Sequence, residues 1–152
     1  MSNQIGTAEH LAYNGCFFGL AQAAAAVAEY AGVEIFCPTT LEAVYIVGIF
    51  NHEATARTLH LDKAATTNMD GLSTALPPAQ RVALGTLLGS TIVEGRTTNA
   101  MTNNPRIELA ANGVWNPTMP ILVAQSNYLS ITNGTANEST NMTLVWYENT
   151  LQ

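Results

Sequence analysis

The sequence predicts a mainly β protein: an antiparallel, jelly-roll-like β-sandwich preceded by an Ala-rich N-terminal arm that is helical or extended. Short runs of β-branched and aromatic residues, bounded by Gly, Asn or Pro, recur from residue 33 to the end of the 152-residue chain. This spacing is typical of the strands of a sandwich. The run GLAQAAAAVAEYAG before them has a different composition. We therefore divide the chain into an arm, residues 1–32, and a β-sandwich domain, residues 33–152.

The arm is nearly uncharged, and its alanine run favours a helix that ends at Gly32. An interface can override that propensity, so an extended conformation stays open. Residues 11–28 approach the length of a membrane span, but they are rich in Ala and Gly and contain Asn14 and Gln22. The first ten residues carry no Lys or Arg, which a signal peptide needs. We expect no membrane partner, and synthesis in the host cytoplasm without a signal peptide.

The predicted strands follow in order along the sandwich domain. VEIFC ends at Pro38, and residues 41–50 are rich in β-branched and aromatic residues. A polar connection over residues 64–79 leads to RVALGTLLGSTIVEG, which is short helix or extended chain. The segments RIEL, PILV, NYLSIT and TNMTLVWYE then follow, each bounded by turn residues. In the last one both alternating sets of side chains are substantially apolar, so we expect it to be covered on both faces.

Residues 44–62, VYIVGIFNHEATARTLHLD, predict a β-hairpin with residues 51–54 as its loop. In this register Ile46 lies opposite Leu59 and Tyr45 lies opposite His60. One face then carries apolar residues throughout, as a sheet packed on a core requires.

The same register tests a metal site at the two histidines of this segment. His52 in the loop and His60 five residues along the strand would be about 17 Å apart, whereas two zinc ligands each lie within about 2 Å of the metal. The histidines therefore cannot share a metal. We expect a solvated loop at His52 and Glu53, and a packed or interface histidine at position 60.

Other chemistry is not indicated. No nucleophile, zinc-protease or phosphate-loop motif is present, and no two carboxylates recur on one predicted face. We expect neither an enzyme nor a cofactor or metal. Three glycosylation sequons, at Asn133, Asn137 and Asn141, crowd one segment. Without a secretion signal we interpret this segment as a polar loop between strands.

Composition favours assembly with other proteins. Only 11% of residues are charged, against about 25% in ordinary soluble domains, so the surface can be buried against partners at low desolvation cost. The net charge is −6, and the five basic residues are dispersed, so we expect no nucleic-acid partner. Cys16 and Cys37 have no metal spacing; free buried thiols are the simpler interpretation, with one disulfide left open. Trp115 and Trp146 suit a core or a subunit interface better than a sugar-stacking platform.

Two segments carry a resemblance to a known group of proteins. VYIVGIFNHEATARTLHL resembles a hairpin of small β-sandwich structural proteins of tailed bacteriophages, and MPILVAQSNYLSITNGTANESTNMTLVWYE resembles their closing hairpin. Together they cover about a third of the chain. The resemblance implies a virion protein of the capsid decoration (cement) type, localised on the capsid surface. Its partners would be the major capsid protein and itself, as a trimer or, less favoured, a dimer.

In this hypothesis the arm makes the contacts, over residues 5–30. Phe17, Phe18 and Leu20 are its anchors, and Tyr30 completes the apolar set. An alternative from the same resemblance is a virion-attached module, part of a head or tail fibre. Such a module would recognise a receptor or glycan through the loop at residues 133–141.

Overall fold

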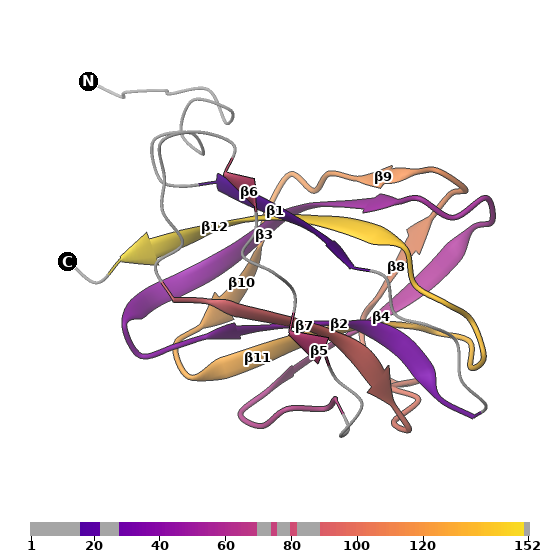
Figure 1. Ribbon diagram of the computed structural model, residues 1–152, viewed down its shortest axis with the longest axis horizontal. Coiled ribbons are helices and arrows are strands. Elements are labelled where there is room, and N and C mark those ends of the chain that lie inside the picture. Colours follow the sequence, from indigo (N-terminus) through magenta and orange to yellow (C-terminus); the bar gives the residue numbers. More distant parts are fainter. Residues whose placement is uncertain (1–15, 22–27, 70–73, 76–79, 82–88, 151–152) are drawn as a thin grey trace.

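The structure, a computed structural model, describes residues 16–21, 28–69, 74–75, 80–81 and 89–150. Every regular element in these ranges is a strand, and the strands form two antiparallel sheets of six strands that face each other (Figure 1). The predicted mainly β sandwich is therefore confirmed. No helix in the described part is long and apolar enough to cross a membrane.

Sheet A is built around the last long strand of the chain. Its order is β10 (Ile121–Ala124), β3 (Leu41–Asn51), β12 (Met142–Thr150), β1 (Cys16–Ala21) and β6 (Gln80–Arg81). The short strand β9 (Val114–Trp115) pairs with the far end of β3, beside β10. A bulge on β3 at Val47, opposite the Val145–Trp146 step of β12, shifts the register between them.

Sheet B has a second set of strands from across the sequence. Its order is β5 (Thr74–Ala75), β7 (Thr91–Thr97), β2 (Tyr30–Cys37), β11 (Asn127–Asn133), β4 (Arg57–Ala64) and β8 (Arg106–Leu109). In both sheets every pairing joins strands that are not consecutive along the chain, as far as the described strands go. The sandwich is thus held together by contacts between distant segments.

The core lies between the two sheets and is supplied by alternate residues of the long strands. Val33, Ile35 and Cys37 of β2 are fully buried, as are Val44 and Ile46 of β3. Sixteen buried residues form one apolar cluster: Val33, Ile35, Cys37, Leu41, Val44, Ile46, Ile49, Leu59, Ile107, Leu109, Val123, Leu129, Ile131, Met142, Leu144 and Trp146. The alternation seen in the sequence therefore does point one face of each strand to the core.

The predicted hairpin over residues 44–62 is wrong. β3 lies in sheet A beside β12, and β4 lies in sheet B beside β11, so residues 52–56 cross from one sheet to the other. Ile46 pairs with Trp146 and Ile121, and Leu59 pairs with Asn133 and Ile107. Both residues do face the core, but from opposite sides. Likewise β11 and β12, expected as a closing hairpin, belong to different sheets.

The N-terminal arm of the prediction does not stand apart from the sandwich where the structure describes it. β1 lies between β12 and β6 in sheet A. Residues 30–32, assigned to the arm, are the first three of β2, and Ala31 among them is fully buried. Of the two conformations left open for the arm, residues 16–21 have the extended one. The rest of the alanine run up to residue 27 lies outside the described residues.

Candidate functional site

An apolar surface without charged groups covers part of the outer face of sheet A. Phe50 pairs with Val114 and Tyr45 pairs with Leu122, so each pair shares the side of the sheet opposite the core. Phe50, Val114 and Leu122 are 37%, 56% and 42% exposed. Tyr45 stacks on Tyr147 of β12, with ring centroids 4.7 Å apart. We call these five residues the sheet A face.

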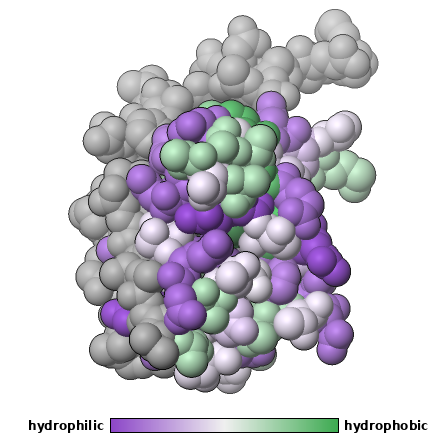
Figure 2. Space-filling model, turned by 90° about the vertical axis from the view of Figure 1, so that its right-hand side faces the viewer, coloured by the Kyte–Doolittle hydropathy of each residue, from purple (hydrophilic) through white to green (hydrophobic). Residues whose placement is uncertain are grey.

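One more large apolar side chain is exposed in the segment that joins β9 to β10. Met119, in the segment between β9 and β10, is 81% exposed. Seen from the end where β3 crosses to β4, apolar residues gather in the upper half of the molecule, above a band of hydrophilic ones (Figure 2). Burial raises the pKa of Tyr147, and the neighbouring Tyr45 raises it further. The Tyr147 hydroxyl therefore stays protonated well above physiological pH.

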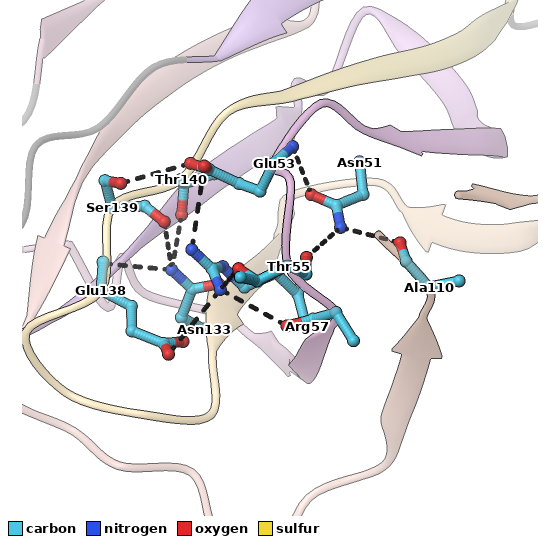
Figure 3. Close-up of polar contacts among 10 residues, drawn as sticks. Asn51, Glu53, Thr55, Arg57, Ala110, Asn133, Glu138, Ser139 and Thr140 are labelled. Carbon is cyan, nitrogen blue, oxygen red and sulfur yellow. Dashed lines mark hydrogen bonds and ion pairs between the residues drawn. The ribbon is translucent and has the colours of Figure 1, made fainter. Parts of the chain in front are cut away.

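A second feature is a polar node where three connections meet at one end of the sandwich (Figure 3). Arg57, at the start of β4, has an 11% exposed side chain that lies 3.8 Å from the Glu53 carboxylate and 3.7 Å from that of Glu138. Its guanidinium also donates to the Thr55 hydroxyl. Glu53 in turn accepts a hydrogen bond of 3.2 Å from Ser139. These contacts join the β3–β4 crossing to the β11–β12 loop.

Two buried asparagines complete the node. The Asn51 amide donates to the carbonyls of Thr55 and Ala110, at 3.0 and 2.9 Å, and so fixes the turn between β8 and β9. The Asn133 amide donates to the Glu138 and Ser139 carbonyls and to the Thr140 hydroxyl, at 2.9–3.1 Å. Asn51 is 4% exposed and Asn133 is 1% exposed. The two side chains therefore act as internal ties.

The node encloses only a very small space. Arg57 Nε, Asn133 Oδ1 and Asn141 Oδ1 are buried, have no hydrogen-bond partner among the described residues, and belong to side chains that line a cavity of about 10 Å³. That volume suits about one water molecule and no organic substrate. The node therefore has a structural role: its hydrogen bonds hold the β8–β9 turn in place next to Val114.

A third feature lies on the outer face of sheet B. Glu34, Ser130 and Asp62 stand side by side on β2, β11 and β4. Asn68, in the segment after β4, donates its side-chain amide to Asp62 at 2.6 Å and to Ser130 at 3.2 Å. Its backbone N–H donates to Glu34 at 2.9 Å. This row fastens residues 65–69 across the sheet and leaves a cleft beside it.

The residues predicted to make contacts are distributed over the fold rather than collected in one site. Phe17, Phe18 and Leu20 lie in β1, in register with Trp146, Val145 and Thr143; their side chains lie outside the described part. Tyr30 begins β2 in sheet B and is half-buried. Trp115 is partly buried against the core.

Trp146 is 1% exposed in the core, where it contacts other core side chains and offers no surface to a partner.

The two histidines considered as metal ligands each contact another part of the fold. His60 is a packed histidine, 6% exposed, with Nδ1 2.9 Å from the Ala100 carbonyl oxygen. It is not beside Tyr45, which belongs to the other sheet. The His52 ring lies 2.7 Å from the Thr143 hydroxyl. Within the described ranges, no three His, Cys, Asp or Glu side chains gather in a metal-binding group.

The sequon segment forms the predicted loop between β11 and β12. Its first asparagine, Asn133, is buried in the node and cannot present its amide to a ligand. Asn137 is exposed, at a positive φ of 66°, and its Oδ1 accepts a hydrogen bond from the Ala28 N–H. Cys37 is a free, buried thiol, as expected.

Sequence reasoning missed the sheet A face and the cleft on sheet B. Part of the signal for the first was present, because Tyr45 lies off the core-facing alternation of Val44 and Ile46. Phe50 reaches the same side only through the bulge at Val47, which the alternation of the sequence does not reveal. The cleft had no such signal, because Glu34, Thr67 and Tyr128 are brought together only by the pairing of distant strands. Comparison of the chain with protein-family models, curated proteins and solved structures found no match.

Proposed function

We propose that this protein is a non-enzymatic structural protein of a virus particle, a capsid decoration (cement) protein that stabilises the shell through subunit contacts. The observation that carries the proposal is the sheet A face, an exposed apolar surface without charge on a chain that is already poor in charge. The resemblance of two segments to phage sandwich proteins supports the virion role. Its partners are the major capsid protein and further copies of itself.

The electrostatics of the chain favour this face for self-association over the described surfaces that carry carboxylates. Each copy carries a net charge of −6, so two copies repel each other, and this repulsion is weakest when they meet through a surface without carboxylates. Phe50, Val114 and Leu122 provide such a surface, and a specific interface buries on the order of 800 Å² on each partner. We expect a closed homo-oligomer, with a trimer favoured over a dimer.

The first test measures the molar mass of the purified protein by light scattering on a sizing column. The wild type should elute as one discrete oligomer, and Phe50→Asp combined with Val114→Asp should give a folded monomer. Thr102→Asp with Thr135→Asp is the matched control, since it adds the same charge at two exposed loop positions away from the face. A monomeric wild type, or equal effects of the two double variants, would contradict assembly through the sheet A face.

The virion role needs a separate test. Particles produced from the genome that encodes this chain should be purified on a density gradient and digested for quantitative mass spectrometry. Peptides of this chain should be present in a fixed ratio to the shell protein and should be lost when Phe50 and Val114 carry the aspartates. Particles free of the chain would refute the decoration role, whatever the oligomeric state.

A further inference from the structure

The cleft on the outer face of sheet B has a volume of about 340 Å³. It lies over β7, β2 and β11, next to residues 65–69, and is lined by Glu34, Phe36, Thr67, Met69, Thr91, Val93 and Tyr128. Ligand sites usually start at about 300 Å³, so the cleft is large enough for one long side chain or a small molecule.

The walls of the cleft are mostly apolar and aromatic. Phe36 and Tyr128 are paired across β2 and β11, with ring centroids 4.5 Å apart and a tilt of 32° between the planes. Met69 and Val93 add aliphatic surface. Such walls suit an alkyl chain, and the rings can also attract a cation.

The base of the cleft carries a negative charge that no described cation balances. Glu34 is 3% exposed and accepts hydrogen bonds from the hydroxyls of Thr67 and Ser130, at 2.6 and 2.7 Å, as well as from the Asn68 N–H. All three donors are neutral, so they orient the carboxylate without cancelling its charge. In the described part of the chain the ion pairs involve Arg57 and Arg96, and their partners are Glu29, Glu53 and Glu138.

A second carboxylate, that of Asp62, adds to the negative potential on the β4 side of Glu34. Asp62 is joined to the Glu34 row through Asn68 and accepts another hydrogen bond from Asn104, of 2.9 Å, which is again a neutral donor. A buried charge strongly favours a counter-charge of opposite sign. The ligand that fits both walls and base therefore has an alkyl stem and a cationic end.

We propose that the sheet B cleft binds a lysine side chain of a partner protein. The alkyl stem lies along Phe36, Tyr128 and Met69, and the ammonium group lies toward Glu34. The net charge of −6 attracts basic partner surfaces at longer range. This inference is independent of the virion role and concerns the sheet opposite the one that we propose for self-association.

The test is a titration of the full chain, followed by amide and methyl NMR shifts. The probe is the peptide acetyl-Gly-Lys-Gly-amide, and its comparison is the same peptide acetylated on the lysine side chain, which keeps the stem and removes the charge. The lysine peptide should give saturable shifts at Phe36, Val93 and Tyr128, with a dissociation constant on the order of 1–10 mM for so small a ligand. The acetylated peptide should bind at least tenfold more weakly.

Three variants decide which residues are responsible. Glu34→Gln should weaken binding of the lysine peptide at least tenfold, whereas Glu108→Gln removes the same charge from exposed β8 and should change it less than twofold. Because Glu34→Gln also removes a hydrogen-bond acceptor of residues 67 and 68, Val93→Trp is the third variant: it fills the cleft and leaves the hydrogen bonds of Glu34 in place. Equal binding of both peptides, equal effects of the two glutamine variants, or full binding by Val93→Trp would each overturn the proposal.

Discussion

At the scale of single residues, the polar node shows how one buried amide can organise a whole loop. Asn133 Nδ2 faces three acceptors within 3.1 Å, and all three belong to residues 138–140 of the β11–β12 loop. The sequence predicts this loop but assigns Asn133 to it as an ordinary turn residue. Nothing in the composition of an Asn-rich turn distinguishes the one asparagine that points inward.

Asn133→Ala should destabilise the protein by about 1–3 kcal/mol, because it leaves two partly buried carbonyls of the loop without their Asn133 donor. Asn103→Ala, at an exposed turn position, should change the free energy of unfolding by less than about 0.5 kcal/mol. Urea denaturation of both variants measures the difference. Equal midpoints would show that the loop is not held by the Asn133 side chain.

The second residue-scale prediction concerns Cys37 and alkaline pH. Burial raises the pKa of this fully buried thiol, and the nearby Glu148 carboxylate raises it further. In the unfolded chain the thiol ionises at about pH 8.5. The folded state therefore holds its proton more tightly, so stability is complete below that pH and falls as the pH rises toward the folded pKa.

Denaturation curves between pH 7 and 10 should show this loss, and Cys37→Ala should flatten the slope while lowering stability at every pH. If the free energy of unfolding of Cys37→Ala falls with pH as steeply as that of the wild type, groups other than Cys37 cause the loss. Alkylation should confirm the wild-type behaviour: at pH 8 the thiol of the native protein should react far more slowly than that of the denatured protein.

At the scale of elements, two strand glycines make a matched pair. A Cβ at Gly32 of β2 would lie 2.3 Å from the Ile131 carbonyl oxygen of β11, so these strands cannot keep their spacing around a side chain. A Cβ at Gly48 of β3 would meet its nearest atoms at 3.7 Å, which is ordinary contact.

Gly32→Ala should therefore cost about 3 kcal/mol or more, in the upper range of overpacking effects. Gly48→Ala should stay within about 1 kcal/mol of the wild type. Thermal and chemical denaturation of the two variants side by side measures this. Similar losses at both positions would contradict the close approach of β2 and β11.

The strands themselves were largely predictable, whereas their partners were not. Segments 33–37, 41–50, 106–109 and 120–123 were all expected as strands, and a strand is found at each, with bounds that differ by at most three residues. Alternation of apolar residues determines which face of a strand meets the core, but the residues on β3 and β4 look the same whether these strands pair or lie in opposite sheets. The proposed register failed for that reason, and with it the expected closing hairpin.

At the scale of the whole molecule, the position of β1 determines what can be removed from the N-terminus. Removal of residues 1–15 leaves every described strand in place, so this variant should still unfold in one cooperative transition. Removal of residues 1–32 takes away β1 and the first three residues of β2, so that β12 loses one neighbour and the core loses Ala31.

The longer truncation should therefore lose its cooperative transition in circular dichroism and the dispersion of its NMR spectrum. A folded, cooperative product would instead show that residues 33–152 are an independent domain, as the composition of the sequence suggests. Capsid binding should accordingly be tested with the shorter truncation, in which a loss of binding cannot be attributed to unfolding.

The order of the strands also has a consequence for how the protein folds during its synthesis on the ribosome. Sheet A has β12 near its centre, between β3 and β1, and β12 occupies residues 142–150. A ribosome covers the most recently added residues of a nascent chain, so sheet A cannot close until β12 has been made and has left the ribosome. Until then the apolar faces of β2 and β3 have no complete partner sheet. Because the chain carries few charges that would oppose association, these faces can aggregate unless a chaperone covers them.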